Sequence, residues 1–199
     1  MADPITAPVV LGTGRLILRA PEPADIEAIT RACQDPDIQR WTTVPSPYRR
    51  EHAEFFVRTL APEGWRTGAT RHWCVLERAG GALVGTQSLS LRAGHPGTAE
   101  IGWWTAPGRR GLGYAVEAAT AVAGYAFAEL GVRRLEWYAL VGNRASLTVA
   151  ERVGFRFEGT LRAYAEHRGA VHDGWLAALL PADLAPPGAA RPGGAGPRT

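Results

Sequence analysis

Residues 100–118 read EIGWWTAPGRRGLGYAVEA, and the character of the chain changes twice within them. Apolar β-forming residues lead up to Pro107, and Gly111 and Gly113 then open an alanine-rich segment that contains no proline or glycine until Gly124. The stretch therefore predicts a strand, a glycine-rich turn and a helix, in that order.

The predicted turn suits a phosphate group. Glycine leaves room for backbone N–H groups to point inward, and the first turn of a helix adds unpaired donors and the positive end of its dipole. Arg109 and Arg110 add charge at the mouth of the turn. A Walker loop is disfavoured because the chain contains no lysine, and a dinucleotide fingerprint is disfavoured because Val116 stands where that motif needs glycine or alanine.

The composition indicates a single globular domain. The chain has 199 residues, of which 46% are hydrophobic and 21% charged, and this is enough for one sizeable core. The formal charge of +3 arises from arginines scattered along the sequence, which favours small anionic ligands over nucleic acid. All 22 basic residues are arginine, and alanine, glycine and proline are abundant, which is typical of a GC-rich bacterial genome.

Cysteine usage and hydropathy favour a cytoplasmic protein. Cys33 and Cys74 stand far apart and outside any zinc-ligand spacing, so we expect neither a disulfide nor a metal site. The amino terminus shows no positively charged start before an apolar core, and no run of about 18 apolar residues occurs. We therefore expect neither secretion nor a membrane partner.

Hydrophobic periodicity and turn residues predict the other elements. Strands are expected at residues 15–19, 72–77, 82–91, 98–105, 134–141, 155–159 and 171–180. Helices are expected at residues 25–35 and 50–60, from the glycine turn to Leu130, and at 144–153; the segments 37–48 and 161–170 should be irregular.

Together these elements predict one mixed α/β domain. The sheet should be mostly antiparallel, and the strand–helix–strand unit over residues 98–141 should form a central right-handed parallel crossover flanked by helices. We expect residues 1–12 to form a flexible leader, 13–182 the domain, and 183–199 a disordered tail rich in alanine, glycine and proline.

A second motif follows the crossover. Residues 141–159 read VGNRASLTVAERVGFRFEG, in which Asn143 and Ser146 lie three positions apart at the start of a predicted helix. This spacing lets both polar side chains face one cleft. The alternative is that Asn143 only caps the helix by accepting a hydrogen bond from its backbone.

These two motifs resemble those of the GNAT superfamily of acetyl-CoA-dependent N-acetyltransferases. Arg110-x-x-Gly113-x-Ala115 is similar to the family's pyrophosphate loop, although a second frame, ending at Gly111-x-Gly113, places Gly108 where the family has glutamine or arginine. Residues 141–159 resemble the second acetyl-CoA motif of the branch of ribosomal-protein alanine acetyltransferases. The resemblance covers residues 13–180, and the motifs occur in the family's order.

The resemblance implies a single GNAT-like domain that transfers the acetyl group of acetyl-CoA to a primary amine, by direct attack in a ternary complex. The acceptor would be a small molecule or a protein N-terminus, and the enzyme a monomer or homodimer; the sequence leaves the choice open. The residues implied in binding acetyl-CoA are Trp103, Trp104, Thr105, Arg109, Arg110, Gly111, Leu112, Gly113, Tyr114, Ala115, Asn143 and Ser146.

The resemblance also implies the chemistry. Glu100 is the leading candidate for the general base, with Glu166 and Asp173 as alternatives, whereas Glu117 is interpreted as structural. Backbone N–H groups of residues 103–105 would stabilise the developing oxyanion. Ser146 would donate a hydrogen bond to the departing sulfur, with Tyr164 as another candidate donor.

A different class of function also fits this scaffold, namely a non-catalytic module that binds acyl-CoA for regulation. The presence of Glu100, Asn143 and Ser146 together favours the enzyme.

Overall fold

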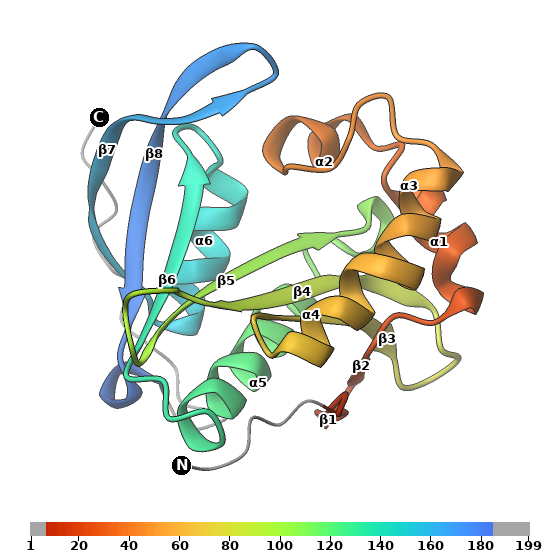
Figure 1. Ribbon diagram of the computed structural model, residues 1–199, viewed down its shortest axis with the longest axis horizontal. Coiled ribbons are helices and arrows are strands. Elements are labelled where there is room, and N and C mark those ends of the chain that lie inside the picture. Colours follow the sequence, from red (N-terminus) through yellow and green to blue (C-terminus); the bar gives the residue numbers. More distant parts are fainter. Residues whose placement is uncertain (1–6, 185–199) are drawn as a thin grey trace.

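One eight-stranded sheet organises the chain in the computed structural model, which describes residues 7–184 (Figure 1). The strand order is β1-β2-β3-β4-β5-β6-β8-β7, and every neighbouring pair is antiparallel except β5 and β6. The strands are β1 (Leu11–Gly12), β2 (Leu16–Arg19), β3 (Thr70–Glu77), β4 (Leu83–Leu91), β5 (Thr98–Thr105), β6 (Arg134–Leu140), β7 (Arg156–His167) and β8 (Ala170–Leu179).

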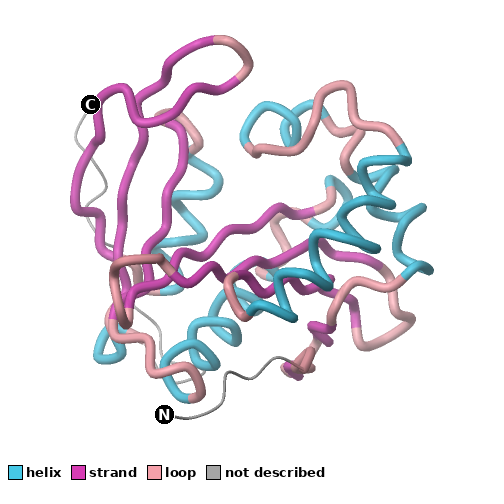
Figure 2. The backbone as a smooth tube through the Cα atoms, in the orientation of Figure 1, coloured by secondary structure: helices cyan, strands magenta, loops and turns pink. Residues whose placement is uncertain are grey.

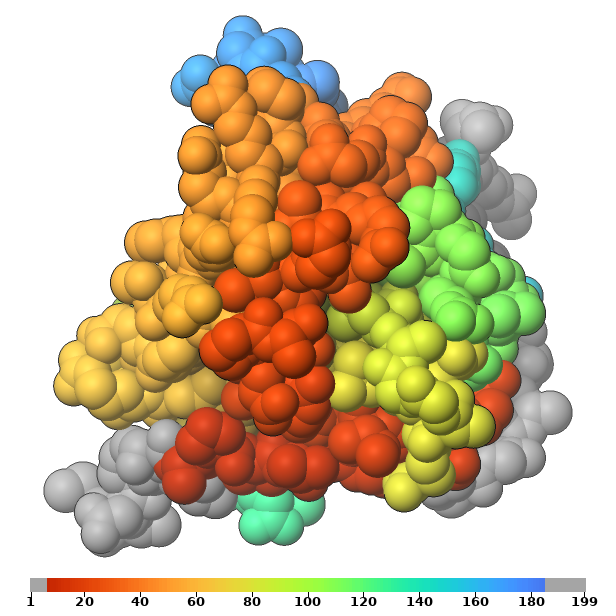
Figure 3. Space-filling model, turned by 90° about the vertical axis from the view of Figure 1, so that its right-hand side faces the viewer, coloured from red at the N-terminus to blue at the C-terminus, as the bar shows by residue number. Residues whose placement is uncertain are grey.

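Helices pack on both sides of this sheet (Figure 2). The α-helices are α1 (Ile26–Ala32), α2 (Pro36–Trp41), α3 (Arg50–Phe55), α4 (Ala61–Thr67), α5 (Tyr114–Ala128) and α6 (Arg144–Val153). A π-helical turn, η2 (Phe56–Leu60), joins α3 to α4. Figure 3 looks at the side where the red to orange N-terminal segments cover much of the surface.

Alternation along the strands divides the core into two clusters. Trp73 and Val75 of β3 pack in the larger cluster with α5 and α6, whereas Cys74 and Leu76 pack in a smaller cluster with α1 and α3. Successive strand residues point to opposite faces, so one strand supplies both clusters. The sheet is therefore the middle layer of the domain.

The pairing between β5 and β6 is short. The parallel register runs only from Thr98, opposite Arg134, to Ile101, opposite Trp137. Beyond it β5 continues to Thr105 and β6 to Leu140, so the two strands separate, as Figure 1 shows. This separation opens the sheet at its centre, next to the N-terminus of α5.

The predicted mixed α/β fold with its central crossover is confirmed. The hairpin of β3 and β4 and the strand β5 also lie where the sequence placed them. The helix α6 begins after Asn143, whose side chain accepts from the N–H of Ser146, and ends at Gly154 with φ of 117°. The predicted caps are thus both present.

The prediction was wrong for the segment 37–48. A helix, α2, occupies its beginning, because Asp35 caps the helix by accepting from the N–H of Ile38 at 2.9 Å. Pro36 occupies the first helical position, where its missing N–H has no partner in any case. Pro36 therefore begins a helix.

The predicted helix at 50–60 is longer in the structure. The helical path runs from Arg50 to Thr67 through η2, where the N–H of Ala61 bonds to the carbonyl of Phe56. The π turn comes immediately before Pro62, which has no N–H to donate. The helix therefore widens and continues.

The segment 161–170, predicted as irregular, is mostly strand. β7 extends to His167 and forms a hairpin with β8, with a register shift between Leu161 and Ala165 around Ala163, whose φ is 51°. β7 is an edge strand, and its exposed polar residues lack the apolar alternation by which a strand is predicted.

Both predicted ends differ in part from the structure. Leu11 and Gly12, assigned to the leader, pair with β2 and belong to the sheet. The C-terminal end of the central helix also differs, because α5 ends at Ala128 and not at Leu130. Residues 1–6 of the leader and 185–199 of the tail lie outside the described residues, and Asp183 belongs to a short 3₁₀ turn.

Candidate active site

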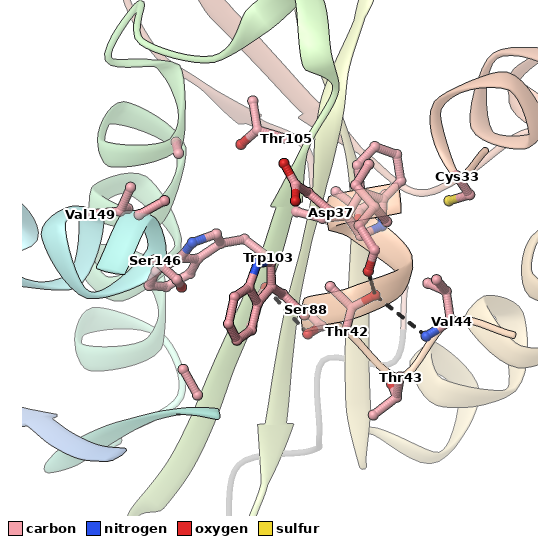
Figure 4. A pocket seen from close by; sticks show the side chains of 18 of the residues that line it. Cys33, Asp37, Thr42, Thr43, Val44, Ser88, Trp103, Thr105, Ser146 and Val149 are labelled. Carbon is pink, nitrogen blue, oxygen red and sulfur yellow. Dashed lines mark hydrogen bonds between the residues drawn. The ribbon is translucent and has the colours of Figure 1, made fainter. Parts of the chain in front are cut away.

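A cavity of about 900 Å³ lies where β5 and β6 separate. Figure 4 shows Trp103 and Ser146 facing this space from one side and Thr42 to Val44 from the other. Of the predicted site residues, those lining it are Glu100, Trp103, Trp104, Thr105, Arg109, Arg110, Gly111, Gly113, Tyr114, Ala115, Asn143 and Ser146. Leu112 is outside this lining, and its side chain is 50% exposed.

The glycine turn leads into α5 with left-handed backbone at two positions. Gly111 has φ of 75° and Gly113, the residue before the helix, has φ of 79°, and this region favours glycine. Within residues 7–184 no side chain caps this helix, so the N–H groups of its first turn are available to a ligand. A Cβ on Gly111 would meet nothing within 4 Å among residues 7–184, so the cradle is open. These features fit a pyrophosphate.

The two arginines of the turn are held by carboxylates in this structure. Arg109 Nη1 lies 3.0 Å from Glu77 Oε1, and Arg110 Nη2 lies 2.5 Å from Asp35 Oδ1. Although burial opposes it, the guanidinium of Arg110 holds the pKa of Asp35 below its usual value. The arginines thus anchor the turn to β3 and to the start of α2, and they add less net charge to the mouth than their number suggests.

The sheet register arranges residues in rows beneath the cavity, and His72, Ser88, Gly102 and Glu100 of these rows line it. His72 on β3, Ser88 on β4 and Gly102 on β5 form one row, because each is paired with the next. The neighbouring row contains Ser90, Glu100 and Glu136. Paired residues share a face of the sheet, so both rows lie on the side of α1 and α3.

Glu100 is half-buried, and within residues 7–184 its carboxylate accepts no hydrogen bond and joins no ion pair. Burial raises its pKa above the usual value; Arg92 opposes this shift and the neighbouring Glu136 adds to it. A carboxylate with a raised pKa that lines a cavity and lacks a partner is free to take a proton from a ligand.

Glu136, directly beside Glu100, has the opposite surroundings. Arg134 donates to its Oε1 at 2.8 Å, and Arg92 and Tyr138 donate to its Oε2. Burial opposes the shift, but these hydrogen bonds lower the pKa of Glu136. Glu136 is therefore held ionised in a network and is not a candidate base.

Asn143 and Ser146 both border the cavity, but their hydrogen bonds differ. The Oδ1 of Asn143 accepts from the N–H of Ser146 at 3.2 Å, so this residue caps α6 in addition to lining the cavity. The Oγ of Ser146 accepts from the indole N–H of Trp137 at 3.1 Å. This bond uses a lone pair of the hydroxyl, and the hydroxyl proton can still be donated into the cavity.

The alternative catalytic candidates lie elsewhere. Glu166 and Asp173 are exposed on β7 and β8 and are not part of the cavity lining, and Asp173 accepts from the backbone of Ala163. Tyr164 stacks on Tyr138, and burial raises its pKa to about 12, which makes it a poor acid. Glu117 accepts from Thr13 and Arg15 and joins α5 to the start of the sheet, as its structural interpretation predicted.

Sequence reasoning missed several residues that line the cavity. Ser88 and His72 could have been found by extending the strand register from Gly102 across the predicted hairpin. Trp41 reaches the cavity because α2 brings its ring to 3.5 Å from a Cβ built on Gly142. Long-range placement decides such residues.

Residues 7–184 contain no group of three or more histidine, cysteine, aspartate or glutamate side chains that could hold a metal ion. Within the same range, no helix combines the length and the apolarity needed to cross a bilayer.

Comparison with known proteins gives a consistent result. The family model described as the acetyltransferase (GNAT) domain matches residues 15–156. YoaA, an uncharacterized N-acetyltransferase of Bacillus subtilis strain 168, is 30% identical over 164 residues, which cover 82% of this chain and 92% of YoaA.

Solved structures match the fold along most of the chain. A GNAT-family acetyltransferase from Bacillus anthracis is 28% identical with a TM-score of 0.75, covering 86% of this chain and 98% of its own. RimL, a ribosomal L7/L12 alpha-N-protein acetyltransferase solved with coenzyme A, has a TM-score of 0.77 with the same coverages. At 20% identity RimL shows the likeness of fold alone.

Proposed function

The chain belongs to the GNAT family of N-acetyltransferases, and on this basis we propose that it transfers the acetyl group of acetyl-CoA to a primary amine by direct attack. The observation that carries the proposal is the unpaired, half-buried carboxylate of Glu100 in the cavity that the glycine turn borders.

Binding of acetyl-CoA is supported by the backbone at the N-terminus of α5. The open cradle at Gly111, the left-handed Gly113 and the uncapped first turn suit a pyrophosphate, and Asn143 and Ser146 line the cavity beyond it. When bound, acetyl-CoA supplies the acetyl group as a thioester. Ser146 can donate its hydroxyl proton in a hydrogen bond to the departing sulfur.

Glu100 can remove the proton that keeps the acceptor amine unreactive at neutral pH. An aliphatic amine with a pKa of about 10 is only about one part in 10³ neutral at pH 7, a handicap of roughly 4 kcal/mol. A carboxylate that accepts the proton, directly or through water, recovers part of this, since general base catalysis contributes typically ~10²–10⁴-fold.

The part of β5 that separates from β6 can stabilise the carbonyl oxygen of the thioester during attack. Residues 102–105 have no partner on β6, because the parallel register ends at Ile101. Backbone N–H groups on an unpaired edge can stabilise charge that develops on a carbonyl oxygen. We assign this role, within residues Trp103 to Thr105, to the N–H groups that point away from β4, as the resemblance implies.

A coupled free-thiol assay tests the proposal. Purified protein with acetyl-CoA and a panel of peptides, polyamines, amino acids and arylalkylamines should release thiol only when an accepted amine is present. Mass spectrometry of the product should show one added acetyl group. Thermal stabilisation by acetyl-CoA without thiol release across the whole panel would favour the alternative, a non-catalytic acyl-CoA-binding module.

A further inference from the structure

The cavity continues past Glu100 toward the N-terminal helices, where a group of apolar side chains lies among polar ones such as Thr42 and Thr43. We call this part the apolar lobe and define it by Val44, Phe55, Phe56, Leu60 and Trp104, all of which line the cavity. Val44, Phe56 and Trp104 also pack against the smaller core cluster. The lobe is therefore built on a part of the core and does not depend on a surface loop alone.

The lobe and Glu100 share one continuous floor. The ring of Phe56 lies edge-on to His72, with 5.3 Å between the ring centres. His72 is the first residue of the row His72, Ser88 and Gly102, and Glu100 lies two residues from Gly102 on the same strand face. A ligand with its amine at Glu100 can thus extend along this row into the lobe.

Gly102 keeps the floor open between them. A Cβ at this position would lie 3.1 Å from the Oγ of Ser88, tighter than ordinary contact. Any side chain at residue 102 would also fill the space between Glu100 and the lobe. The absence of one leaves a passage.

The rim of the lobe exposes large apolar side chains. Phe55 is 57% exposed and Leu60 is 46% exposed, and the π turn between them carries both into the cavity lining while Val57 stays in the core. Exposed apolar groups that border a concave site are typical of ligand contacts, and π turns occur often at functional sites.

Charge is distributed unevenly along the cavity. Its three arginines, Arg109, Arg110 and Arg152, belong to the glycine turn and α6. The carboxylates in the lining that residues 7–184 provide are Glu100 and Asp37, and Asp37 pairs with Arg110. Burial lowers the pKa of His72 to about 4, so this imidazole is neutral at pH 7. His52, which also lines the cavity, accepts the backbone N–H of Arg49 at its Nδ1. The five residues that define the lobe carry no charged group.

We propose that the apolar lobe holds the uncharged aromatic body of a small primary monoamine whose amino group lies at Glu100. This inference rests on the proposed function and names the class of acceptor. A polyamine would need further carboxylates for its other charges. A free amino acid would need a cation near Glu100 for its carboxylate, and the arginines of the lining belong to the glycine turn and α6. A peptide would bring amide groups against the exposed apolar side chains of Phe55 and Leu60.

The first test compares amines that differ in the group attached to the amino nitrogen. Values of kcat/KM are measured by thiol release with 2-phenylethylamine, ethanolamine, spermidine and a short peptide with a free N-terminus. The value for 2-phenylethylamine should exceed that for ethanolamine by about 10- to 100-fold, which is the preference expected when a phenyl-sized group is buried. Equal or better use of any of the other three would overturn the inference while the proposed function stands.

The second test uses variants at the exposed rim, where the fold does not depend on the side chain. Phe55→Ser and Leu60→Ser should each raise the KM for 2-phenylethylamine by about tenfold. The matched control is Val171→Ser, because Val171 is 65% exposed on β8 and outside the cavity lining; it should leave the KM unchanged. Unchanged KM values in both rim variants would refute the binding of the aromatic group in the lobe.

A binding measurement separates the two proposals. Calorimetric titration of 2-phenylethylamine into the protein with coenzyme A present should show binding that Phe55→Ser weakens. Such binding without turnover of any amine would refute the proposed function and support the ligand class. If 2-phenylethylamine neither binds nor reacts, the inference is refuted.

Discussion

Glu100 and Glu136 are paired residues on adjacent parallel strands, yet they ionise differently because their partners differ. Two arginines and a tyrosine donate to Glu136 and lower its pKa, whereas burial raises the pKa of Glu100, which has no such partner among residues 7–184. Two carboxylates whose surroundings push their pKa values apart often have separate roles. Here one carboxylate stabilises the sheet and the other is free for chemistry.

Replacing Glu100 with glutamine should lower kcat/KM at pH 7 by about 10²–10⁴-fold, because the amide cannot accept a proton. The base must be ionised to act, so activity of the parent protein should fall as the pH drops through the raised pKa of Glu100. This acid limb should vanish in the variant, and the loss should shrink at high pH, where the amine is already neutral.

The matched control for that experiment is Glu166→Gln, since Glu166 is exposed and outside the cavity lining. It should keep both the rate and the acid limb. If the pH–rate profile of Glu100→Gln runs parallel to that of the parent protein, Glu100 is not the base.

Ser146→Ala should raise the barrier by about 1–2 kcal/mol, roughly tenfold in rate, if the hydroxyl donates one hydrogen bond to the leaving sulfur. The melting temperature should also fall, because the indole N–H of Trp137 loses its acceptor. Asn143 and not this hydroxyl caps α6, so the helix itself should persist. Kinetics and thermal melting of the same sample measure both effects.

Ser88→Ala is the comparison for that variant, because Ser88 also lines the cavity and donates to the carbonyl of Gly102. It should affect the rate less than Ser146→Ala. An unchanged rate per folded molecule in Ser146→Ala would remove Ser146 from catalysis, whereas a loss near ~10²–10⁴-fold would make it the obligatory proton donor.

At the scale of elements, two helices begin at the cavity but use their N-termini differently. The side chain of Asn143 caps α6, which occupies one of that helix's free donors within the protein. In the part of the chain that the structure describes, no side chain caps α5, whose preceding residue is the left-handed Gly113. A helix start without an internal acceptor can bind an anion, so α5 is the element suited to the pyrophosphate.

Gly113→Val should weaken binding of acetyl-CoA by at least about tenfold, since a β-branched residue disfavours the left-handed backbone that shapes the turn. Gly94→Val is the matched control: φ of Gly94 is 78° and it lies in the exposed loop between β4 and β5. Both variants should lose about 1–2 kcal/mol of stability. Calorimetry that finds equal affinity for acetyl-CoA in the two variants would exclude the turn from the site.

At the scale of the molecule, contacts between distant segments close the cavity. Arg110 joins the glycine turn to Asp35 before α2, and Arg168 on the β7–β8 hairpin donates to the carbonyls of Gln39 and Val44 at the other end of α2. The helix α2 is thereby held at both ends. On β3, the ring of His72 is partly buried against Phe56 of η2.

The partly buried His72 should make stability depend on pH. Burial lowers its pKa to about 4, whereas the unfolded chain binds the proton near the usual value of about 6.5. The unfolded state therefore takes up a proton first, and stability should be lost as the pH falls from about 6.5 to about 4, by up to about 3 kcal/mol. Urea unfolding at several pH values measures this.

His72→Gln should flatten the stability profile in this range, because no ionisable group remains at the position. His95→Gln, at an exposed loop position, should leave the profile as in the parent protein. Equal slopes in the parent protein and His72→Gln between pH 6.5 and 4 would contradict the prediction.

Local sequence signals were sufficient to predict several elements of the fold. The hairpin of β3 and β4, the strand β5 with its glycine turn, and α6 with its caps follow from alternation, glycine and helix-end residues close in the chain. The motif residues Gly113, Asn143 and Ser146 were found for the same reason. Each of these patterns involves only residues that are close together in the sequence.

Features that depend on contacts between remote segments could not be predicted from local signals. The pairing of Glu100 with Glu136, the ion pair of Arg110 with Asp35 and the apolar lobe each join residues from different elements. The exposed edge strand β7 lacks a clear pattern of its own and is specified by its pairing with β8. Register and burial are set by hydrogen bonding and packing across the sheet, and local sequence does not encode these partners.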